Sequence, residues 1–445
     1  MQKRTIYTLP KDTQIDGKTI ANLITLHKKD VATYAILESY IDDEPTSQRE
    51  APNEILAVHN FAEYIRDTNV GYLLGNSVDY KASDESKLDT IVEKYSEQSI
   101  SELDTDLAED LSMYGQAFEN IYVDENTEVL SAKLSAFNTI VVYDDTFKHN
   151  KMFAVYYSPL VDSKGVLSKD SYDVTIWTDT KIMERTLNKE TLSGEETNDD
   201  IHTFGEVPVV HYMNNKRMKG DYESVISLID AYNILQSDRV LDREKLVDAI
   251  LAFYGASMTP EDMKSLKEHR TIGLPPNSKA EYLIKEIDEA DADVLRKTIA
   301  ADIHKFSKTP DFTDEKFGNA PSGVSLKYKI LSLEWNAQKK EQHFAAGLKD
   351  RFRMYVEVLK LASKLSDTIN VSKVEAVFKR SLPKNDLETS QMINNLDSIV
   401  DQETLVGQLS FVKDASKVVE KTKEEREESL ANNNFGTNLP TDEEE

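Results

Sequence analysis

Residues 221–254 contain neither proline nor glycine, and they lie between Gly220 and Gly255. Apolar side chains in this stretch recur at the three- and four-residue spacing of one helical face. They are Val225, Leu228, Ile229, Tyr232, Leu235, Leu246, Val247, Ile250, Leu251 and Tyr254. A single helix of this length would extend about 50 Å, whereas helices in compact domains are usually about three turns long. The stretch therefore predicts an elongated structure.

A small mixed segment follows this predicted helix. Pro260 suits the first turn of a short helix, Gly273 and the prolines after it favour a turn, and AEYLIKEI is typical of a strand. A second helical stretch begins near Asp288. The pattern predicts a stalk that carries a small module. A coiled-coil hairpin is the alternative, but the apolar stripe lacks a strict heptad with charge pairs beside it.

The composition limits the class of protein. The 445 residues suggest about three domains, and 39% hydrophobic residues suffice for real cores. The absence of cysteine excludes disulfides and thiolate metal sites, which is in keeping with a reducing cytoplasm. No apolar run reaches membrane-spanning length, and the opening residues show no signal-peptide pattern. We therefore expect a protein without a membrane partner.

The chain before residue 221 has a mixed pattern. Helical spacing occurs over residues 20–41, 54–69 and 86–114. Strand patterns occur in ENIYV, TIVVYD, KMFAVYYS and YDVTIWTD. The polar stretch 188–206 is interpreted as a loop, and the residues from 431 onward are expected to be disordered because they offer little apolar surface to bury.

Sequence motifs of enzymes are missing. The chain has no GxxxxGK[ST] loop and no HExxH pair. The acidic group Asp104, Asp106, Glu109 and Asp110 imitates a two-metal nuclease site, but helical spacing is expected to spread these carboxylates over solvated faces. His202 and His211 are interpreted as residues of the fold rather than as ligands. We expect no catalysis, metal or cofactor.

Five segments, in the same order, resemble the portal proteins of long-tailed bacteriophages of Gram-positive bacteria. The first two are a helix leading to a glycine-bounded strand and a helix-glycine-strand unit. The third and fourth are similar to the start of the stem helix and of the kinked inner helix. The fifth is similar to the crown region, where the turn at Asp401 opens a helix. The segments are residues 59–80, 111–125, 213–242, 321–334 and 396–425.

The resemblance implies an α+β, mainly helical portal fold, in which about twelve copies form a ring around a central channel. It also implies a division of the chain into named parts. These are the wing (1–220), a stem helix (221–255), the clip (256–287), a second stem helix (288–309), the tunnel loop (310–323), the kinked helix with the wing return (324–384), the crown (385–430) and a disordered acidic tail (431–445).

The function implied by the resemblance is mechanical. The ring would occupy one capsid vertex of the virion, and double-stranded DNA would pass through it during packaging, retention and ejection. The implied partners are the terminase, a head completion or adaptor protein, and the capsid and scaffolding proteins, with assembly in the host cytoplasm. An acidic scaffold or coat-type protein of the phage head is the alternative.

Net charge bears on how such a channel would treat DNA. The chain has 53 basic and 80 acidic residues, a net charge of −27, which is the wrong sign for gripping phosphates. An acidic channel wall would let DNA slide, whereas an acidic outer surface would serve solubility alone. The sequence leaves both interpretations open.

The tunnel loop supplies the candidate DNA-proximal residues. The turn-rich stretch before Gly323 follows one predicted helix and precedes another, and Ser322 suits the cap of the second helix. In the family this loop narrows the channel around DNA. The candidates are Phe312, Lys316, Phe317 and Asn319. An ordinary helix-helix connection is the alternative.

One segment has a net positive charge, in contrast to the chain as a whole. Residues 324–365 contain nine basic and four acidic side chains, a net charge of +5, on a helical pattern in which Gly347 would permit a bend. The candidate contacts are Lys327, Lys329, Lys339 and Lys340. Pairing with acids of neighbouring subunits is favoured over contact with DNA, because such acidic subunits need complementary charge. The patch Lys216, Arg217 and Lys219 has the same two interpretations.

Overall fold

The computed structural model describes most of the chain in two compact units. The first unit comprises Met1–Asn319 and Leu326–Ser381, and the second comprises Ala320–Ser325 and Leu382–Glu445. The described residues are 4–43, 57–81, 99–161, 165–188, 194–245, 250–255, 257–269, 273–283, 289–313, 323–361, 374–380, 386–397, 399–409, 412 and 415–434.

The largest sheet of the first unit has six strands in the order β1-β5-β6-β7-β8-β9. Strand β1 pairs parallel to β5, and the other neighbours are antiparallel. The strands are β1 (Tyr7–Leu9), β5 (Thr139–Asp144), β6 (Lys151–Val161), β7 (Leu167–Trp177), β8 (Lys181–Asn188) and β9 (Gly194–Ile201). The strands expected in TIVVYD, KMFAVYYS and YDVTIWTD are confirmed.

Strand β9 corrects the expected loop over residues 188–206. Its composition is polar, but its backbone groups pair with β8 from Ile201 to Gly194. Ladder hydrogen bonds therefore stabilise a strand whose side chains give no apolar signal.

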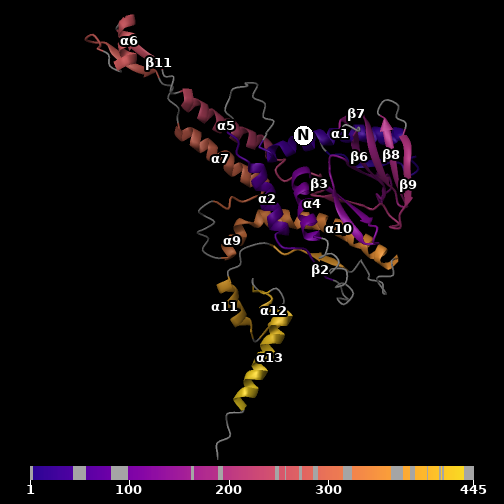
Figure 1. Ribbon diagram of the computed structural model, residues 1–445. Helices are drawn as coiled ribbons and strands as arrows, with labels where there is room; N and C mark the ends of the chain where they lie inside the picture. Colours follow the sequence, from indigo (N-terminus) through magenta and orange to yellow (C-terminus); the bar gives the residue numbers. More distant parts are fainter. Residues whose placement is uncertain are drawn as a thin grey trace, which may run out of the picture. The chain divides into compact units, whose positions relative to one another are not determined.

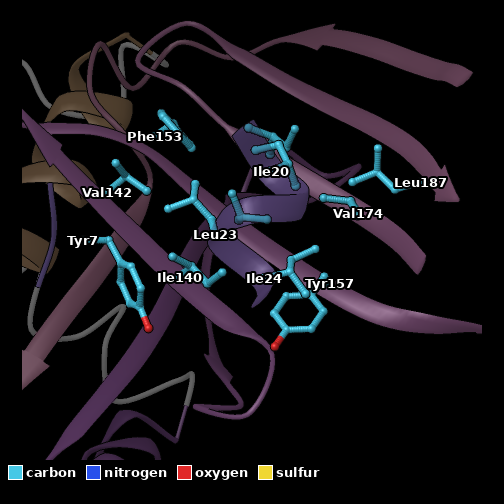
Figure 2. Close-up of a cluster of buried hydrophobic side chains, with 12 residues drawn as sticks. Tyr7, Ile20, Leu23, Ile24, Ile140, Val142, Phe153, Tyr157, Val174 and Leu187 are labelled. Carbon is cyan, nitrogen blue, oxygen red and sulfur yellow. The ribbon is translucent and has the colours of Figure 1, made fainter. Parts of the chain in front are cut away.

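Helix α1 (Gly17–Ile41) lies against this sheet (Figure 1). The helix begins where the Asp16 carboxylate accepts a hydrogen bond of 2.8 Å from the Thr19 backbone N–H. Figure 2 shows how Ile20, Leu23 and Ile24 point from the helix into the apolar strand side chains. The partners include Tyr7, Ile140, Val142, Phe153, Val155, Tyr157, Val174, Ile176 and Leu187. Alternation along the strands gives the sheet the apolar face that α1 covers.

A second, smaller sheet has three strands. Its order is β10-β3-β4, formed by β10 (Val209–Met213), β3 (Gln116–Val123) and β4 (Val129–Leu134). Helix α4 (Ile100–Tyr114) leads into β3 through Gly115, which confirms the expected helix-glycine-strand unit. Gly115 has φ +80°, and a Cβ there would lie 2.1 Å from the Met218 carbonyl oxygen. Only glycine permits this turn and this close approach.

The long helix expected from the sequence is shorter than its apolar stripe. Helix α5 (Ile226–Lys245) ends before the last apolar residues, and Ile250–Tyr254 form strand β11. Strand β11 pairs antiparallel with β12 (Lys279–Leu283). The expectation of one helix through Tyr254 is therefore wrong. A short apolar run satisfies both helical and strand periodicity, and a partner strand distant in sequence decides between them.

Between these strands lies α6 (Pro260–His269), which begins at the expected proline. The Thr259 N–H and hydroxyl both donate to the Asp262 carboxylate, at 3.0 Å and 2.7 Å. The Asp262 N–H in turn donates to the Thr259 hydroxyl, so the first turn is capped reciprocally. No residue of α6 is buried.

Helix α7 (Glu289–Ser307) runs beside α5, as Figure 1 shows. At their base these two helices share an apolar cluster with α1 and α2 (Phe61–Leu74). The cluster contains Leu37, Tyr40, Ala62, Ile65, Tyr222, Val225, Ile226, Ile229, Tyr232 and Ile303. Burial of these side chains fixes the base of the helical pair to the rest of the first unit.

The chain next forms α9 (Gly323–Lys329) and α10 (Leu331–Leu361). At the junction the Ile330 N–H donates to the Leu326 carbonyl at 3.2 Å, and the Glu334 N–H donates to the Ile330 carbonyl at 2.9 Å. A Cβ at Gly347 would lie 2.3 Å from the ring of Tyr212. The glycine is therefore explained by close packing of α10 on β10, and a bend at this position stays a prediction. Strands β2 (Asp79–Lys81) and β13 (Glu375–Val377) pair antiparallel next to α10.

The second unit is helical in its described residues, with α11 (Asp386–Leu396), α12 (Gln402–Val406) and α13 (Ala415–Asn434). The Asp401 carboxylate accepts a 2.8 Å hydrogen bond from the Thr404 N–H, which confirms that this turn opens a helix. Helix α13 extends to Asn434, and the rest of the tail expected to be disordered lies outside the described residues. Within the described chain, no helix combines the length and apolarity needed to span a membrane.

Candidate functional site

The first residues of the predicted tunnel loop form an anchored segment, residues 309–313. Helix α7 ends at Ser307, and Lys308 adopts a left-handed conformation with φ 63°. This conformation reverses the chain and is costly for a residue other than glycine. Phe312 is 41% exposed. The other candidates, Lys316, Phe317 and Asn319, lie outside the described residues.

Tyr64 of α2 holds two backbone groups of this segment. Its hydroxyl donates to the Pro310 carbonyl oxygen at 2.9 Å. The same hydroxyl accepts from the Phe312 N–H at 3.0 Å. Both hydrogen-bonding functions of the phenol are thus used on the start of the loop.

Asn69 of α2 holds the residue just before Pro310. Its amide nitrogen donates to the Thr309 hydroxyl at 2.9 Å and to the Ile65 carbonyl at 2.8 Å. Its amide oxygen accepts from the Asn336 side chain of α10 at 3.2 Å. Thr309 and Asn69 are both buried. Asn69 therefore links the start of the loop to α10 as well as to α2.

His304 closes the segment from the side of α7. Its Nδ1 lies 3.0 Å from the Thr309 carbonyl oxygen, and because a carbonyl only accepts, Nδ1 carries the hydrogen. Its ring packs edge-on against Tyr64, with ring centroids 5.6 Å apart. Asp311 accepts from the Thr313 N–H and hydroxyl at 2.9 Å and 2.6 Å, which closes a local turn. Nothing in the sequence pattern singled out Tyr64 or Asn69, because both lie in an ordinary helical pattern.

The basic candidates on α9 and α10 fall into two groups. Lys327 and Lys339 are exposed, and Lys329 is half-buried. Lys340 is buried, and it forms an ion pair with Asp221 at the start of the α5 region. Asp221 also accepts from the Ser112 hydroxyl at 2.7 Å and from the Asn214 amide at 3.0 Å. Lys340 is therefore a residue of the subunit interior, and its assignment to DNA or to a neighbouring subunit is wrong.

Three other basic residues of this segment also pair within the chain. Arg353 donates to Glu206 at 2.8 Å and 2.6 Å, in a bidentate arrangement, and Lys360 pairs with Glu357 at 2.8 Å. Arg351, which is fully buried, donates to Asp104 at 2.6 Å. Much of the positive charge of residues 324–365 is thus neutralised inside one subunit.

Arg351 is the centre of a buried network that joins α10, α4 and the second sheet. Its Nε lies 2.8 Å and 2.9 Å from the two carboxylate oxygens of Glu119. The Tyr212 hydroxyl donates to Glu119 at 2.6 Å. Burial raises the pKa of Asp104, and the charge of Arg351 opposes that rise. The network holds α10 over β3 and β10.

The acidic group on α4 is not a solvated nuclease-like cluster. Asp104 and Asp110 are 4% and 5% exposed, and only Asp106 and Glu109 are half-buried. Asp110 pairs with Lys133 at 3.2 Å, and burial raises its pKa to about 6. The expectation that all four lie on solvated faces is wrong, because cationic partners from β4 and α10 allow two of them to be buried.

The two histidines singled out in the sequence have partners in the fold. The Nε2 of His211 lies 2.9 Å from the Gln116 Oε1, and its Nδ1 lies 2.9 Å from the Tyr143 hydroxyl. Burial lowers the pKa of His211 to about 3. His202 is bonded to the Thr178 carbonyl oxygen at 2.9 Å. Across the described residues, no group of three or more His, Asp or Glu side chains is placed to bind a metal ion.

The patch Lys216, Arg217 and Lys219 lies in the turn before Asp221 and is exposed. The turn is fixed by the Asn214 and Asn215 side chains, which donate to the Lys219 carbonyl at 2.8 Å and 2.7 Å.

A third ion network joins α2, α10 and the segment after β13, where Arg380 donates to Glu334 and Glu341 at 3.0 Å and 2.6 Å.

Comparison with known proteins finds related sequences over most of the chain. A family model described as "Phage portal protein, SPP1 Gp6-like" matches residues 20–431. The portal protein of Bacillus phage SPP1 is 24% identical over 406 residues, which cover 87% of this chain and 78% of that protein. The portal protein of Clostridium phage phiCD119 is 23% identical over 407 residues, which cover 87% of this chain and 88% of that protein.

Proposed function

The chain belongs to the SPP1 Gp6-like family of phage portal proteins, and we propose that it forms the ring at one capsid vertex through which DNA is packaged, retained and ejected. The observation that carries the proposal is the family match over residues 20–431, which includes every element of the candidate site. The ring would contain about twelve copies, and it would act by shape and charge rather than by catalysis.

The described elements support a proposed division of the ring into parts. We propose α5 and α7 as the stem, because they run side by side from a shared apolar base. Residues 256–287 are proposed as the clip, which would dock the terminase and later a head completion or adaptor protein. This assignment is supported by α6, which has no buried residue and so leaves its side chains available to partners. The wing would comprise residues 1–220 and the return through residue 384, and residues 385–430 would form the crown.

Residues 310–323 are proposed as the loop that approaches DNA. The proposal rests on its position between α7 and α9 and on the anchored segment 309–313. Phe312 is exposed there, and Lys316, Phe317 and Asn319 are the further candidate contacts. A loop whose start is fixed by a packed helix suits a contact that must tolerate passing DNA.

The exposed lysines of α9 and α10 are proposed as contacts between neighbouring subunits. Lys327 and Lys339 lie on a chain with a net charge of −27, so the surface that a second copy presents is mostly acidic. Charge complementarity of this kind sets register and suppresses wrong contacts. Lys329 is proposed to contribute in the same way. Capsid and scaffolding proteins are proposed as further partners of the ring.

Electron microscopy tests the proposal directly. End-on negative-stain images of the purified full-length protein should show rings with a central channel. An acidic scaffold or coat-type protein, the alternative function, would give no such channel. Images that contain only monomers or closed shells would contradict the proposal.

A further inference from the structure

The start of the candidate loop, residues 309–313, is held by α2 as well as by the end of α7. Four side chains outside the segment contact residues 309–313, and two of them, Tyr64 and Asn69, belong to α2. The other two, His304 and Ser307, lie on α7. The segment is therefore tied laterally to a helix far away in the sequence.

We propose that Tyr64 is a positioning residue that fixes residues 309–313 to α2, so that α2, and not the end of α7 alone, sets where the loop starts. The importance of this for DNA rests on the proposed function of the loop. The bonding of one hydroxyl to both Pro310 and Phe312 carries the proposal, since it spans the first turn after α7.

Packing around α2 holds the Tyr64 hydroxyl in place. Ala62 and Ile65, two neighbours on α2, are 1% and 0% exposed in the shared apolar cluster. The helix begins where the Asn60 side chain accepts a 2.8 Å hydrogen bond from the Glu63 N–H. The Tyr64 ring also packs edge-on against His304. A hydroxyl held on a packed helix can impose its position on the segment that it bonds.

Asn69 extends the same platform to α10. It donates to Thr309 and accepts from Asn336, so the start of the loop, α2 and α10 share one hydrogen-bonded path. Lys308, by contrast, adopts the left-handed conformation where the chain leaves α7. A single residue in this conformation gives the chain a point at which it changes direction. The contacts to α2 then fix the direction that follows.

The variant Tyr64→Phe removes one hydroxyl and keeps the ring. The matched control is Tyr40→Phe, whose hydroxyl donates to Asp230 at 2.7 Å in the same helical cluster. Hydrogen exchange of the full-length protein should show protection of the Phe312 amide falling about fivefold to tenfold in Tyr64→Phe. The control should leave it unchanged. Unchanged protection in Tyr64→Phe would overturn the proposal.

A second readout separates positioning from the role of the loop in DNA handling. Rings of Tyr64→Phe should assemble and melt like the wild type, but DNA retention should fall in a reconstituted packaging system. If exchange at Phe312 rises while both Tyr64→Phe and Lys316→Ala package and retain DNA normally, the positioning stands and the DNA role of the loop fails. If exchange is unchanged, the positioning fails whatever the packaging result.

Discussion

The Nε atom of Arg351 lies 2.8 Å and 2.9 Å from the two carboxylate oxygens of Glu119, although 232 residues separate them in the chain. Both side chains are fully buried. Asp104 adds a second carboxylate at 2.6 Å from Nη1. The position of the long helix α10 over the second sheet therefore depends on compensation of charges that neither sequence segment can satisfy alone.

Removing Arg351 should destabilise the protein strongly. Arg351→Met would leave Glu119 and Asp104 buried without their cation, at a cost of about 3 to 5 kcal/mol in the free energy of unfolding. Urea unfolding of the full-length protein measures it. Adding Glu119→Gln and Asp104→Asn should recover part of the loss, because the uncompensated charges disappear. A loss below about 1 kcal/mol for Arg351→Met would contradict this account of the network.

Gly347→Ala should also destabilise the first unit. Its Cβ would lie 2.3 Å from the Tyr212 ring, and overpacking of this kind costs about 1 to 3 kcal/mol. Gly71→Ala in α2 is the matched control, since no atom lies within 4 Å of the added carbon. That control should stabilise its helix by about 0.5 to 1 kcal/mol. Thermal unfolding of the two variants should therefore shift in opposite directions.

Stability should fall as the pH drops below 6.5, in part because of His27. Burial lowers the pKa of His27 from 6.5 to about 4, and its Nδ1 lies 2.9 Å from the Tyr157 hydroxyl. Between these two pH values the unfolded chain binds a proton that the folded chain refuses, so stability rises with pH by up to about 1.4 kcal/mol per unit. The contribution of His27 to the free energy of unfolding is fully present above pH 6.5 and is lost as the pH falls toward 4.

The raised pKa of Asp110, about 6, acts in the opposite direction over part of this range. Comparison with a variant isolates the histidine. His27→Gln keeps a hydrogen-bonding side chain that does not titrate, and its urea midpoint should vary less with pH between 6.5 and 4. An equal pH slope in the variant and the wild type would exclude His27 as a source.

Lys316→Ala should weaken DNA retention and leave ring assembly intact. Lys316 is the one basic residue of 310–323, and Asp311, Asp314 and Glu315 precede it in the sequence. Its removal leaves the loop without a basic side chain that could contact a DNA phosphate. Packaging and retention in a reconstituted system measure the effect. Normal packaging here, together with failed ring assembly when Phe312 and Phe317 are replaced by alanine, would identify the loop as a clasp between subunits.

Deletion of residues 256–287 should abolish terminase binding and spare ring formation. Helix α6 lies in this segment and has no buried residue, so its deletion removes little of the core. A pull-down with purified terminase is the direct measurement. Normal binding by the deletion variant would show that the docking surface lies elsewhere in the chain.

The sequence by itself determined the family and many of the local structures. Apolar spacing and turn chemistry identified α1, three strands of the largest sheet (β5, β6 and β7), the helix-glycine-strand unit at Gly115 and the helix that opens after Asp401. These features depend on residues close together in the chain, where periodicity and turn chemistry act.

Tertiary structure alone decided the rest. Ile250–Tyr254 form a strand because they pair with β12, and Lys340 is an interior residue because it pairs with Asp221. Tyr64 became part of the candidate site because its hydroxyl meets the backbone of residues 310 and 312. In each case the partner is distant in sequence, and a periodic pattern cannot specify which distant groups will be brought into hydrogen-bonding or ion-pairing distance.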